Sequence, residues 1–163
     1  MAIKIKPDYA DAHYNLGIAL VAEGKNEEAI SHYKMAIKIK PDYADAYNNL
    51  GNALPAEGKN EEAISHYKMA IKIKPDYAEA YNNLGNALFR AKMTEEAINY
   101  YKEAIRIRPG FYVAHYNLGN VLFQKGEIKE AIDHYRETLK LKPDLVVGQK
   151  NLETALLRSE ELE

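Results

Sequence analysis

The fold is decided by residues 41–74, PDYADAYNNLGNALPAEGKNEEAISHYKMAIKIK. Residues 7–40 match this stretch at 30 of 34 positions, and residues 75–108 match it at 22 of 34. Five prolines mark the same period of 34 residues: Pro7, Pro41, Pro75, Pro109 and Pro143. Self-similarity at a fixed period of about 20–50 residues is typical of solenoid proteins, in which each repeat packs on its neighbours.

Each repeat has the pattern of two helices joined by a tight turn. In the first repeat, apolar residues recur at helical spacing from Ala10 to about Ala22, and again from Ala29 onward. Gly24 lies between them and favours the left-handed conformation that ends a helix. Asp8, Asp42 and Asp76, which follow the prolines of the first three repeats, predict caps for the first helices, and Gly110 lacks this function in the fourth repeat. Asn26 predicts a cap for the second helix.

The period divides the chain into six segments. They are residues 1–6, the remnant of a preceding second helix; residues 7–40, 41–74, 75–108 and 109–142, the four repeats; and residues 143–163, a C-terminal capping helix. Because residues 1–6 repeat residues 35–40 letter for letter, we expect the array to be either cut from a longer one or engineered.

Two repeats depart from the pattern at the end of their first helix. In the second repeat Pro55 replaces Val21 of the first, which predicts a kink or an early helix end because proline lacks the N–H that continues a helix. In the third repeat the turn Ala91-Lys92-Met93 contains no glycine.

Several positions in every repeat resemble the tetratricopeptide (TPR) pattern. They are the pairs Leu16-Gly17, Leu50-Gly51, Leu84-Gly85 and Leu118-Gly119; the alanines Ala29, Ala63, Ala97 and Ala131; and the tyrosines Tyr33, Tyr67, Tyr101 and Tyr135. Glycine and alanine allow two helices to approach closely, and tyrosine fills the gap between them. The resemblance covers essentially the whole chain. It implies an all-α, right-handed α-solenoid of antiparallel helix pairs, a TPR superhelix of about nine helices, whose first helices line a concave groove.

The first helices also carry a row of asparagines, which we call the asparagine ladder. Asparagines come directly before the four Leu-Gly pairs and directly after three of them. The members of the ladder are Asn15, Asn49, Asn83 and Asn117 before the pairs, and Asn52, Asn86 and Asn120 after them. A side-chain amide donates and accepts as a peptide bond does, so a ladder of amides could hold an extended backbone. A similar ladder belongs to the TPR superhelix of the protein O-GlcNAc transferase family. The resemblance is to the repeats of that family and not to its catalytic domain, so it does not imply the transferase activity. Alternatively, these asparagines are a consensus of the helix surface without a ligand.

Hydrogen bonds alone are too weak for this purpose. Four or five of them contribute roughly 2–7 kcal/mol, whereas micromolar binding requires about 8 kcal/mol. Phe89 and Phe123, one helical turn beyond two of the asparagines, are candidate anchors, with Arg90 and Tyr116 beside them. We therefore predict a scaffold that binds an extended peptide or partner segment in the groove of repeats three and four.

Composition and motifs argue against other classes. A net charge of −2 does not favour nucleic acid or an anionic membrane. The absence of cysteine excludes thiolate chemistry, and the five histidines form no metal-binding motif. We expect no catalytic site, no metal, no cofactor and a soluble, cytoplasmic protein. The competing hypothesis is an inert or engineered array whose main interaction is end-to-end self-association.

Overall fold

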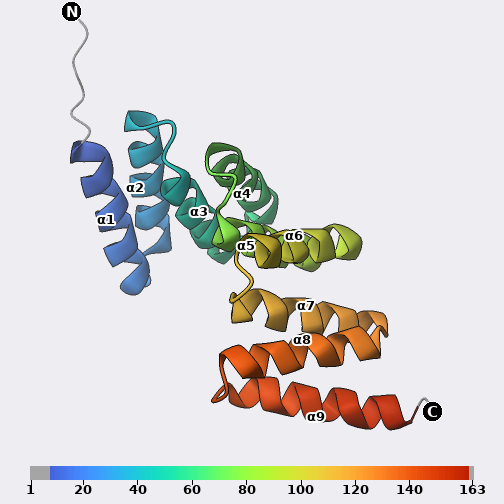
Figure 1. The fold of residues 1–163 in the computed structure, drawn as a ribbon. Helices are drawn as coiled ribbons and strands as arrows, with labels where there is room; N and C mark the ends of the chain where they lie inside the picture. The colour runs from blue at the N-terminus through green and yellow to red at the C-terminus, as the bar shows by residue number, and fades with distance from the viewer. Residues whose placement is uncertain (1–7, 162–163) are drawn as a thin grey trace, which may run out of the picture. The chain divides into compact units, whose positions relative to one another are not determined.

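The computed structural model describes residues 8–161, and these form nine α-helices and one short 3-10 helix, without a strand (Figure 1). The helices are α1 (Asp8–Ala22), α2 (Asn26–Ile39), α3 (Ala44–Ala53), η1 (Leu54–Glu57), α4 (Asn60–Ile73), α5 (Ala78–Arg90), α6 (Thr94–Ile107), α7 (Tyr112–Lys125), α8 (Ile128–Leu141) and α9 (Val146–Glu160). The prediction of an all-α chain of about nine helices is confirmed. The predicted helix remnant at residues 1–6 lies outside the described residues.

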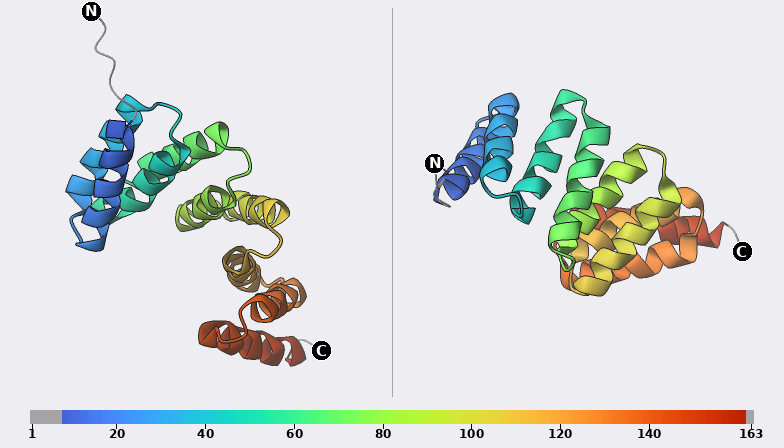
Figure 2. Two further views of the ribbon diagram at one scale, coloured as in Figure 1. Left: turned by 60° about the vertical axis from the view of Figure 1, so that its left-hand side comes forward. Right: turned by 90° about the horizontal axis from the view of Figure 1, so that it is seen from above.

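The chain divides into two compact units, Met1–Asn83 and Leu84–Glu163, and helix α5 contributes to both. In the first unit α1 packs on α2, α2 on α3, and α3 on α4. In the second unit α6 packs on α7, α7 on α8, and α8 on α9. Figure 2 shows that consecutive helices within a unit run antiparallel. Each helix pair therefore buries its apolar faces against its sequence neighbours, as expected of a solenoid.

A glycine and a tyrosine hold the two helices of each repeat together. A Cβ atom added to Gly85 would lie 2.7 Å from Cε1 of Tyr101, closer than carbon atoms can pack, and Tyr101 is only 1% exposed. The corresponding distances are 2.5 Å for Gly17 to Tyr33, 2.6 Å for Gly51 to Tyr67 and 2.8 Å for Gly119 to Tyr135. The predicted packing of tyrosine against glycine is confirmed in all four repeats.

The predicted caps of α2 and α3 are wrong. Asn26 is the first residue of α2, and the cap position is held by Lys25, whose side chain makes no capping hydrogen bond. In the second repeat Tyr43 holds the cap position of α3, also without a capping bond, so Asp42 lies one residue too early. The backbone itself shapes this turn, since the N–H of Tyr43 donates to the carbonyl of Lys40 at 3.2 Å.

The turns of the second and third repeats, which depart from the repeat pattern in sequence, also differ from each other in structure. Helix α3 ends at Ala53, and the 3-10 helix that follows contains Pro55 in its first turn, so the predicted early helix end is confirmed. In the third repeat Lys92 takes the left-handed place of the missing glycine with φ of 65°. The glycines at the corresponding turns of the other repeats have φ values of 76°, 73° and 88°.

Candidate functional site

The second unit contains an open hollow of about 430 Å³. Helices α5, α7 and α9 supply most of its wall, and α6 and α8 each contribute a tyrosine. The lining residues are Asn86, Phe89, Tyr101, Asn117, Asn120, Val121, Phe123, Gln124, Tyr135, Asn151 and Thr154. None of the eleven is charged, so the hollow offers amides, hydroxyl groups and aromatic rings to a ligand.

The structure brings five of the predicted site residues to this hollow: Asn86, Phe89, Asn117, Asn120 and Phe123. Both phenylalanines are half-buried, so part of each ring is still exposed to solvent. Two other predicted residues of this unit, Arg90 and Tyr116, are not among the lining residues. Arg90 is exposed at the end of α5, and Tyr116 is half-buried within the hydrogen-bond network described next.

A hydrogen-bond network joins the wall of the hollow across two repeats. Tyr135 donates its hydroxyl proton to Oδ1 of Asn120 at 2.9 Å. Nδ2 of Asn151 donates to the same oxygen at 2.9 Å, and to the hydroxyl of Tyr116 at 3.2 Å. An amide oxygen accepts two hydrogen bonds, so that of Asn120 is fully used, and its NH₂ group is the part left for a ligand.

The buried tyrosines Tyr101 and Tyr135 donate their hydroxyl protons to ladder asparagines. Tyr101 donates to Oδ1 of Asn86 at 2.7 Å, as Tyr135 does to its own asparagine. Burial raises the pKa of Tyr135 to about 12, although a hydrogen bond with Asn151 works in the opposite direction. Burial also raises the pKa of Tyr101, and the charge of Arg90 opposes that shift. Both hydroxyl groups therefore keep their protons at neutral pH.

The first unit repeats the network. Tyr67 donates to Oδ1 of Asn52 at 2.8 Å. Nδ2 of Asn83 donates to the same oxygen at 3.2 Å and to Oδ1 of Asn48 at 3.1 Å. Like its counterpart in the second unit, the oxygen of Asn52 is therefore saturated.

The first repeat differs because Ile18 replaces the second asparagine. Nδ2 of Asn49 donates to the hydroxyl of Tyr14 at 3.1 Å. Asn15, at the start of the ladder, lies exposed on α1. The ladder amides thus have a structural role between repeats that the sequence did not predict.

Sequence reasoning missed several participants in these networks. Asn48 and Asn82 are buried at 4% and 3% exposure, one position before the ladder. Tyr101 and Tyr135 were assigned only to packing, yet their hydroxyl groups set the orientation of the amides. A signal was present, since a tyrosine follows the second asparagine by 15 residues in three repeats.

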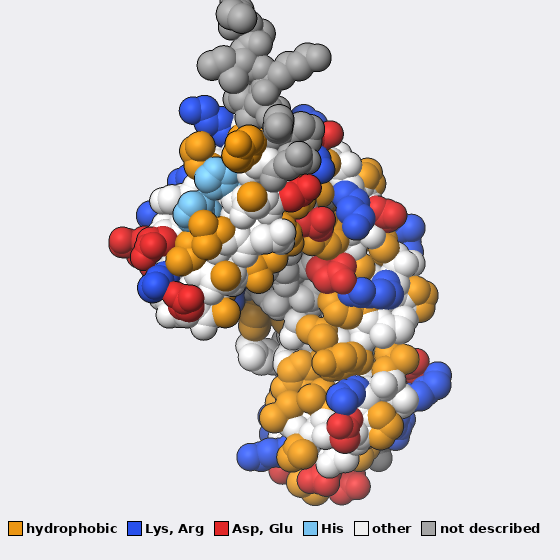
Figure 3. Space-filling view, turned by 90° about the vertical axis from the view of Figure 1, so that its left-hand side faces the viewer, with side chains coloured by type: hydrophobic (Ala, Val, Ile, Leu, Met, Phe, Trp, Pro, Cys, Tyr) orange, Lys and Arg blue, Asp and Glu red, His pale blue; other side chains and the backbone are white. Residues whose placement is uncertain are grey.

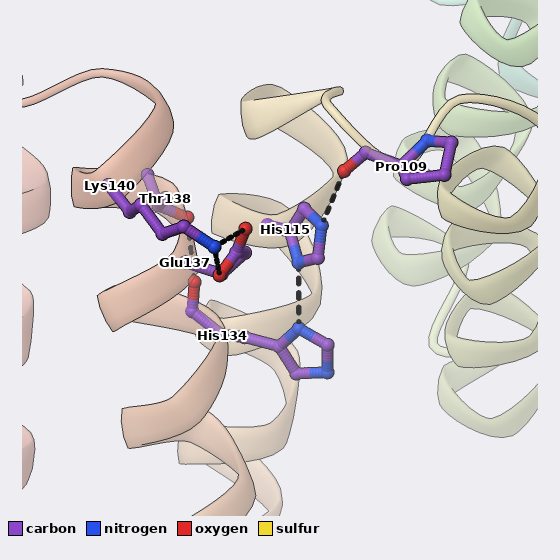
Figure 4. A network of polar contacts seen from close by, with 6 residues as sticks. All are labelled: Pro109, His115, His134, Glu137, Thr138 and Lys140. Carbon is purple, nitrogen blue, oxygen red and sulfur yellow. Dashed lines mark hydrogen bonds and ion pairs between the residues drawn. The ribbon is translucent and has the colours of Figure 1, made fainter.

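Four of the five histidines form two pairs, which their spacing of 19 residues in the sequence did not suggest. Nε2 of His115 lies 3.1 Å from the carbonyl oxygen of Pro109 and must donate to it, so its Nδ1 accepts from Nδ1–H of His134 at 3.1 Å (Figure 4). His13 and His32 make the same contact at 2.8 Å. Burial, then the facing His115, lower the pKa of His134 to about 4. The pair thus links two helices in its neutral form.

Within residues 8–161 no group of three or more histidine and acidic side chains could hold a metal ion. The hollow, the amide networks and the stacked helix pairs define a helical repeat protein with an open, uncharged hollow in its second unit. Family models match the chain over most of its length: one described as TPR repeat at residues 19–55 and 51–92, and one described as tetratricopeptide repeat at residues 78–111 and 112–145. The chain belongs to the tetratricopeptide repeat family.

Solved structures of other TPR proteins resemble the chain. MamA is 28% identical, with a TM-score of 0.79, and the match covers 88% of this chain and 84% of that one. PilF of Pseudomonas aeruginosa is 26% identical, with a TM-score of 0.87, over 94% and 70% of the two chains. YrrB, described as a TPR protein with an unusual peptide-binding site, shares the fold at 20% identity and a TM-score of 0.73, over 91% and 76% of the two chains. No curated protein matches the chain.

No helix in the described part of the chain is long and apolar enough to cross a membrane. The similarity to O-GlcNAc transferase repeats remains a resemblance at the level of the asparagine ladder.

Proposed function

We propose that the chain is a protein–protein interaction scaffold, not an enzyme, and that the hollow in its second unit binds an extended peptide or partner segment. The observation that carries this proposal is the composition of the hollow. Uncharged amides alternate there with two half-buried phenylalanine rings, and no charged side chain lines it. Such a surface favours a neutral segment with apolar side chains.

The amides would bind the backbone of that segment. The oxygen of Asn120 is already occupied by Tyr135 and Asn151, so this amide can offer only its N–H groups. A donor of this kind is matched by a backbone carbonyl, which every peptide carries. Recognition by the ladder should therefore depend little on the sequence of the guest.

Phe89 and Phe123 would supply the anchoring energy. Full burial of a phenylalanine side chain contributes about 1.5–3 kcal/mol, and these two are half-buried already, so each has roughly 1 kcal/mol left to gain. Together they contribute about 2 kcal/mol, equivalent to roughly a 30-fold difference in affinity. Because only apolar guest side chains bury these rings, the two phenylalanines should select among peptides.

The test begins with linear peptides selected from a random library on the unmodified chain. The affinity of each peptide is then measured by fluorescence anisotropy for the unmodified protein and for the double variant Phe89→Ala/Phe123→Ala. We expect the double variant to weaken binding about 30-fold. Leu157→Ala, which truncates an exposed apolar residue outside the hollow, should change nothing. Equal affinity for both proteins would refute the role of the rings.

A second variant tests the amide donors. Asn120→Asp keeps an oxygen that accepts from Tyr135 and Asn151 but replaces the NH₂ group by a charged oxygen, which repels guest carbonyls. We expect it to lower the affinity of all selected peptides by a similar factor. Asn52→Asp makes the same change in the network of the first unit, outside the hollow, and should leave binding intact. If the two variants behave alike, the ladder is structural only.

A further inference from the structure

In the fourth repeat two imidazole rings face each other between helices α7 and α8 (Figure 4). Nδ1 of His115 lies 3.1 Å from Nδ1 of His134. Imidazole nitrogens are common ligands of transition-metal ions, and their bonds to Zn²⁺ are about 2.0–2.1 Å long. Two such bonds that enclose an angle of about 100°, between the square-planar and tetrahedral values, place their nitrogens about 3.1 Å apart. The two nitrogens therefore have the separation that a shared metal ion requires.

The backbone fixes the tautomer of His115. Its Nε2 lies 3.1 Å from the carbonyl oxygen of Pro109 and must donate to it, so its Nδ1 carries a lone pair. Metal-binding histidines typically donate their second N–H to a carbonyl or carboxylate oxygen in this manner, which orients the ring and leaves the other nitrogen to bind the metal. The ring is also buried, at 8% exposure. His115 thus has the arrangement of a preorganised ligand.

His134 is the adjustable member of the pair. It is half-buried on α8, and Figure 4 shows its second nitrogen turned away from His115. The ring centroids lie 5.3 Å apart, so the two Nδ1 atoms face each other almost head-on, and the rings must swing before both lone pairs converge on one ion. The χ2 angle of histidine is broad, so this swing breaks one hydrogen bond and adds little strain. The Nδ1 proton of His134 moves to Nε2 by exchange with solvent, and both rings stay neutral.

The charges around the pair balance one another. Lys102 and Asp133 both act on His134, with opposite signs. Glu130 is exposed one helical turn before this histidine on α8, and the equivalent Glu62 lies 3.5 Å from Nε2 of the histidine in the second repeat. Because residues four apart are neighbours on a helix surface, a carboxylate at this position can reach the imidazole and offset the charge of a cation.

The first repeat contains a pair of the same kind. Nδ1 of His13 lies 2.8 Å from Nδ1 of His32, and both residues are half-buried. Figure 3 shows imidazole groups, in pale blue, at the surface of the first unit, where solvent reaches them. In the second repeat Tyr47 faces His66 instead, with ring centroids 5.8 Å apart. The chain therefore supplies its own one-histidine version of this contact.

We propose that His115 and His134 bind a divalent late transition-metal ion (Cu²⁺, Zn²⁺ or Ni²⁺) through their Nδ1 atoms, with water in the remaining coordination positions. The ion would link α7 to α8. With two protein ligands the site is weak and exchangeable, unlike the groups of three or more that residues 8–161 lack. We expected no metal ion because the sequence contains no metal-binding motif, but the fold brings together histidines 19 residues apart. The pair does not line the hollow, so the proposal is independent of the proposed function.

The probe is Zn²⁺ alone, and Mg²⁺, which prefers oxygen ligands, is the control ion. Binding is measured by isothermal titration calorimetry near neutral pH on the protein with His13→Tyr, so that only the pair of the fourth repeat remains. This substitution copies the tyrosine–histidine contact of the second repeat. If two ligands supply half the free energy of a four-ligand zinc site, the Kd is on the order of 10 µM. We expect no binding of Mg²⁺ in the same range.

Three further substitutions in this protein form a matched set. His115→Tyr and His134→Tyr each introduce the residue that another repeat has at that position, so the fold should be retained, which circular dichroism checks. Each should weaken Zn²⁺ binding about 100-fold because one of two ligands is lost. His66→Tyr removes a histidine that faces a tyrosine and should leave the Kd unchanged.

Nitrogen NMR of the protein with isotope-labelled histidine identifies the atoms that bind. Zn²⁺ should shift Nδ1 of both His115 and His134 and leave the Nε2–H of His115 in place. The same Kd for His115→Tyr and His66→Tyr would overturn the proposal, because Zn²⁺ would then bind elsewhere, for example to surface carboxylates. Shifts confined to Nε2 of His134 would also overturn it, since the ion would bind one exposed ring and would not link the helices.

Discussion

The turn at Lys92 offers a sharp test of how the backbone of the repeats is specified. Its φ of 65° is the left-handed conformation that glycine adopts at the same turn in the other three repeats. In this conformation a residue with a Cβ atom is disfavoured by about 1–2 kcal/mol. We expect Lys92→Gly to remove that strain and to stabilise the protein.

The gain is smaller than the strain because glycine loses more backbone entropy on folding, about 0.5–1 kcal/mol. The net stabilisation should be about 0.5–1 kcal/mol. For a chain of 163 residues this corresponds to a rise in Tm of roughly 1–4 °C. The measurement is thermal unfolding followed by circular dichroism, together with urea denaturation.

Two controls isolate the conformational effect. Ala91→Gly introduces the same flexibility one residue earlier, where φ is not positive, and should destabilise the protein. Gly126→Lys makes the reverse exchange at a turn with φ of 88° and open space around the Cβ position, so only backbone strain should be added. If Lys92→Gly and Ala91→Gly lower the Tm equally, the assigned strain does not exist.

Two further outcomes follow from the buried contacts. Gly85→Ala would push a methyl group into the ring of Tyr101 and should destabilise the protein by about 1–3 kcal/mol in urea denaturation, whereas Gly110→Ala, whose nearest neighbour would lie 3.9 Å away, should be neutral. Because the folded protein lowers the pKa of His134 from 6.5 to about 4, the unfolded chain binds more protons between these values. The contribution of the neutral pair with His115 is complete above about pH 6.5 and is lost as the pH falls toward 4. Replacing His134 with tyrosine, the residue that the third repeat has there, should flatten this dependence in denaturation curves measured from pH 7.5 to pH 4.

The sequence predicted those parts of the fold that depend on periodic packing. Because the repeats align on their prolines, equivalent residues share equivalent places, and the contact of glycine with tyrosine follows directly. Proline at position 55 also had a local consequence, since its missing N–H ends α3 early. Such features are decided within one repeat and its neighbours, where the pattern of residue types is informative.

The partners of the individual hydrogen bonds could not be predicted from the repeat pattern. Asp42 and Asn26 are suitable capping residues by type, but a shift of one residue in the helix start removes the capping geometry. The ladder amides were assigned to a ligand because amides match peptide groups. The same property lets them bind one another, and the spacing of 31 residues between Asn120 and Asn151 hides that contact in the sequence.

The amide networks have a consequence for how such a chain can change in length. Among the side-chain hydrogen bonds described above, the largest separation along the sequence is 35 residues, just over one period. In each of these bonds the later segment of the chain supplies the amide donor and the earlier repeat supplies the acceptor. An in-frame duplication of residues 41–74 would place the same amide donors and acceptors on both sides of the new junction, so gene recombination can lengthen the array there without the need for a second, compensating mutation.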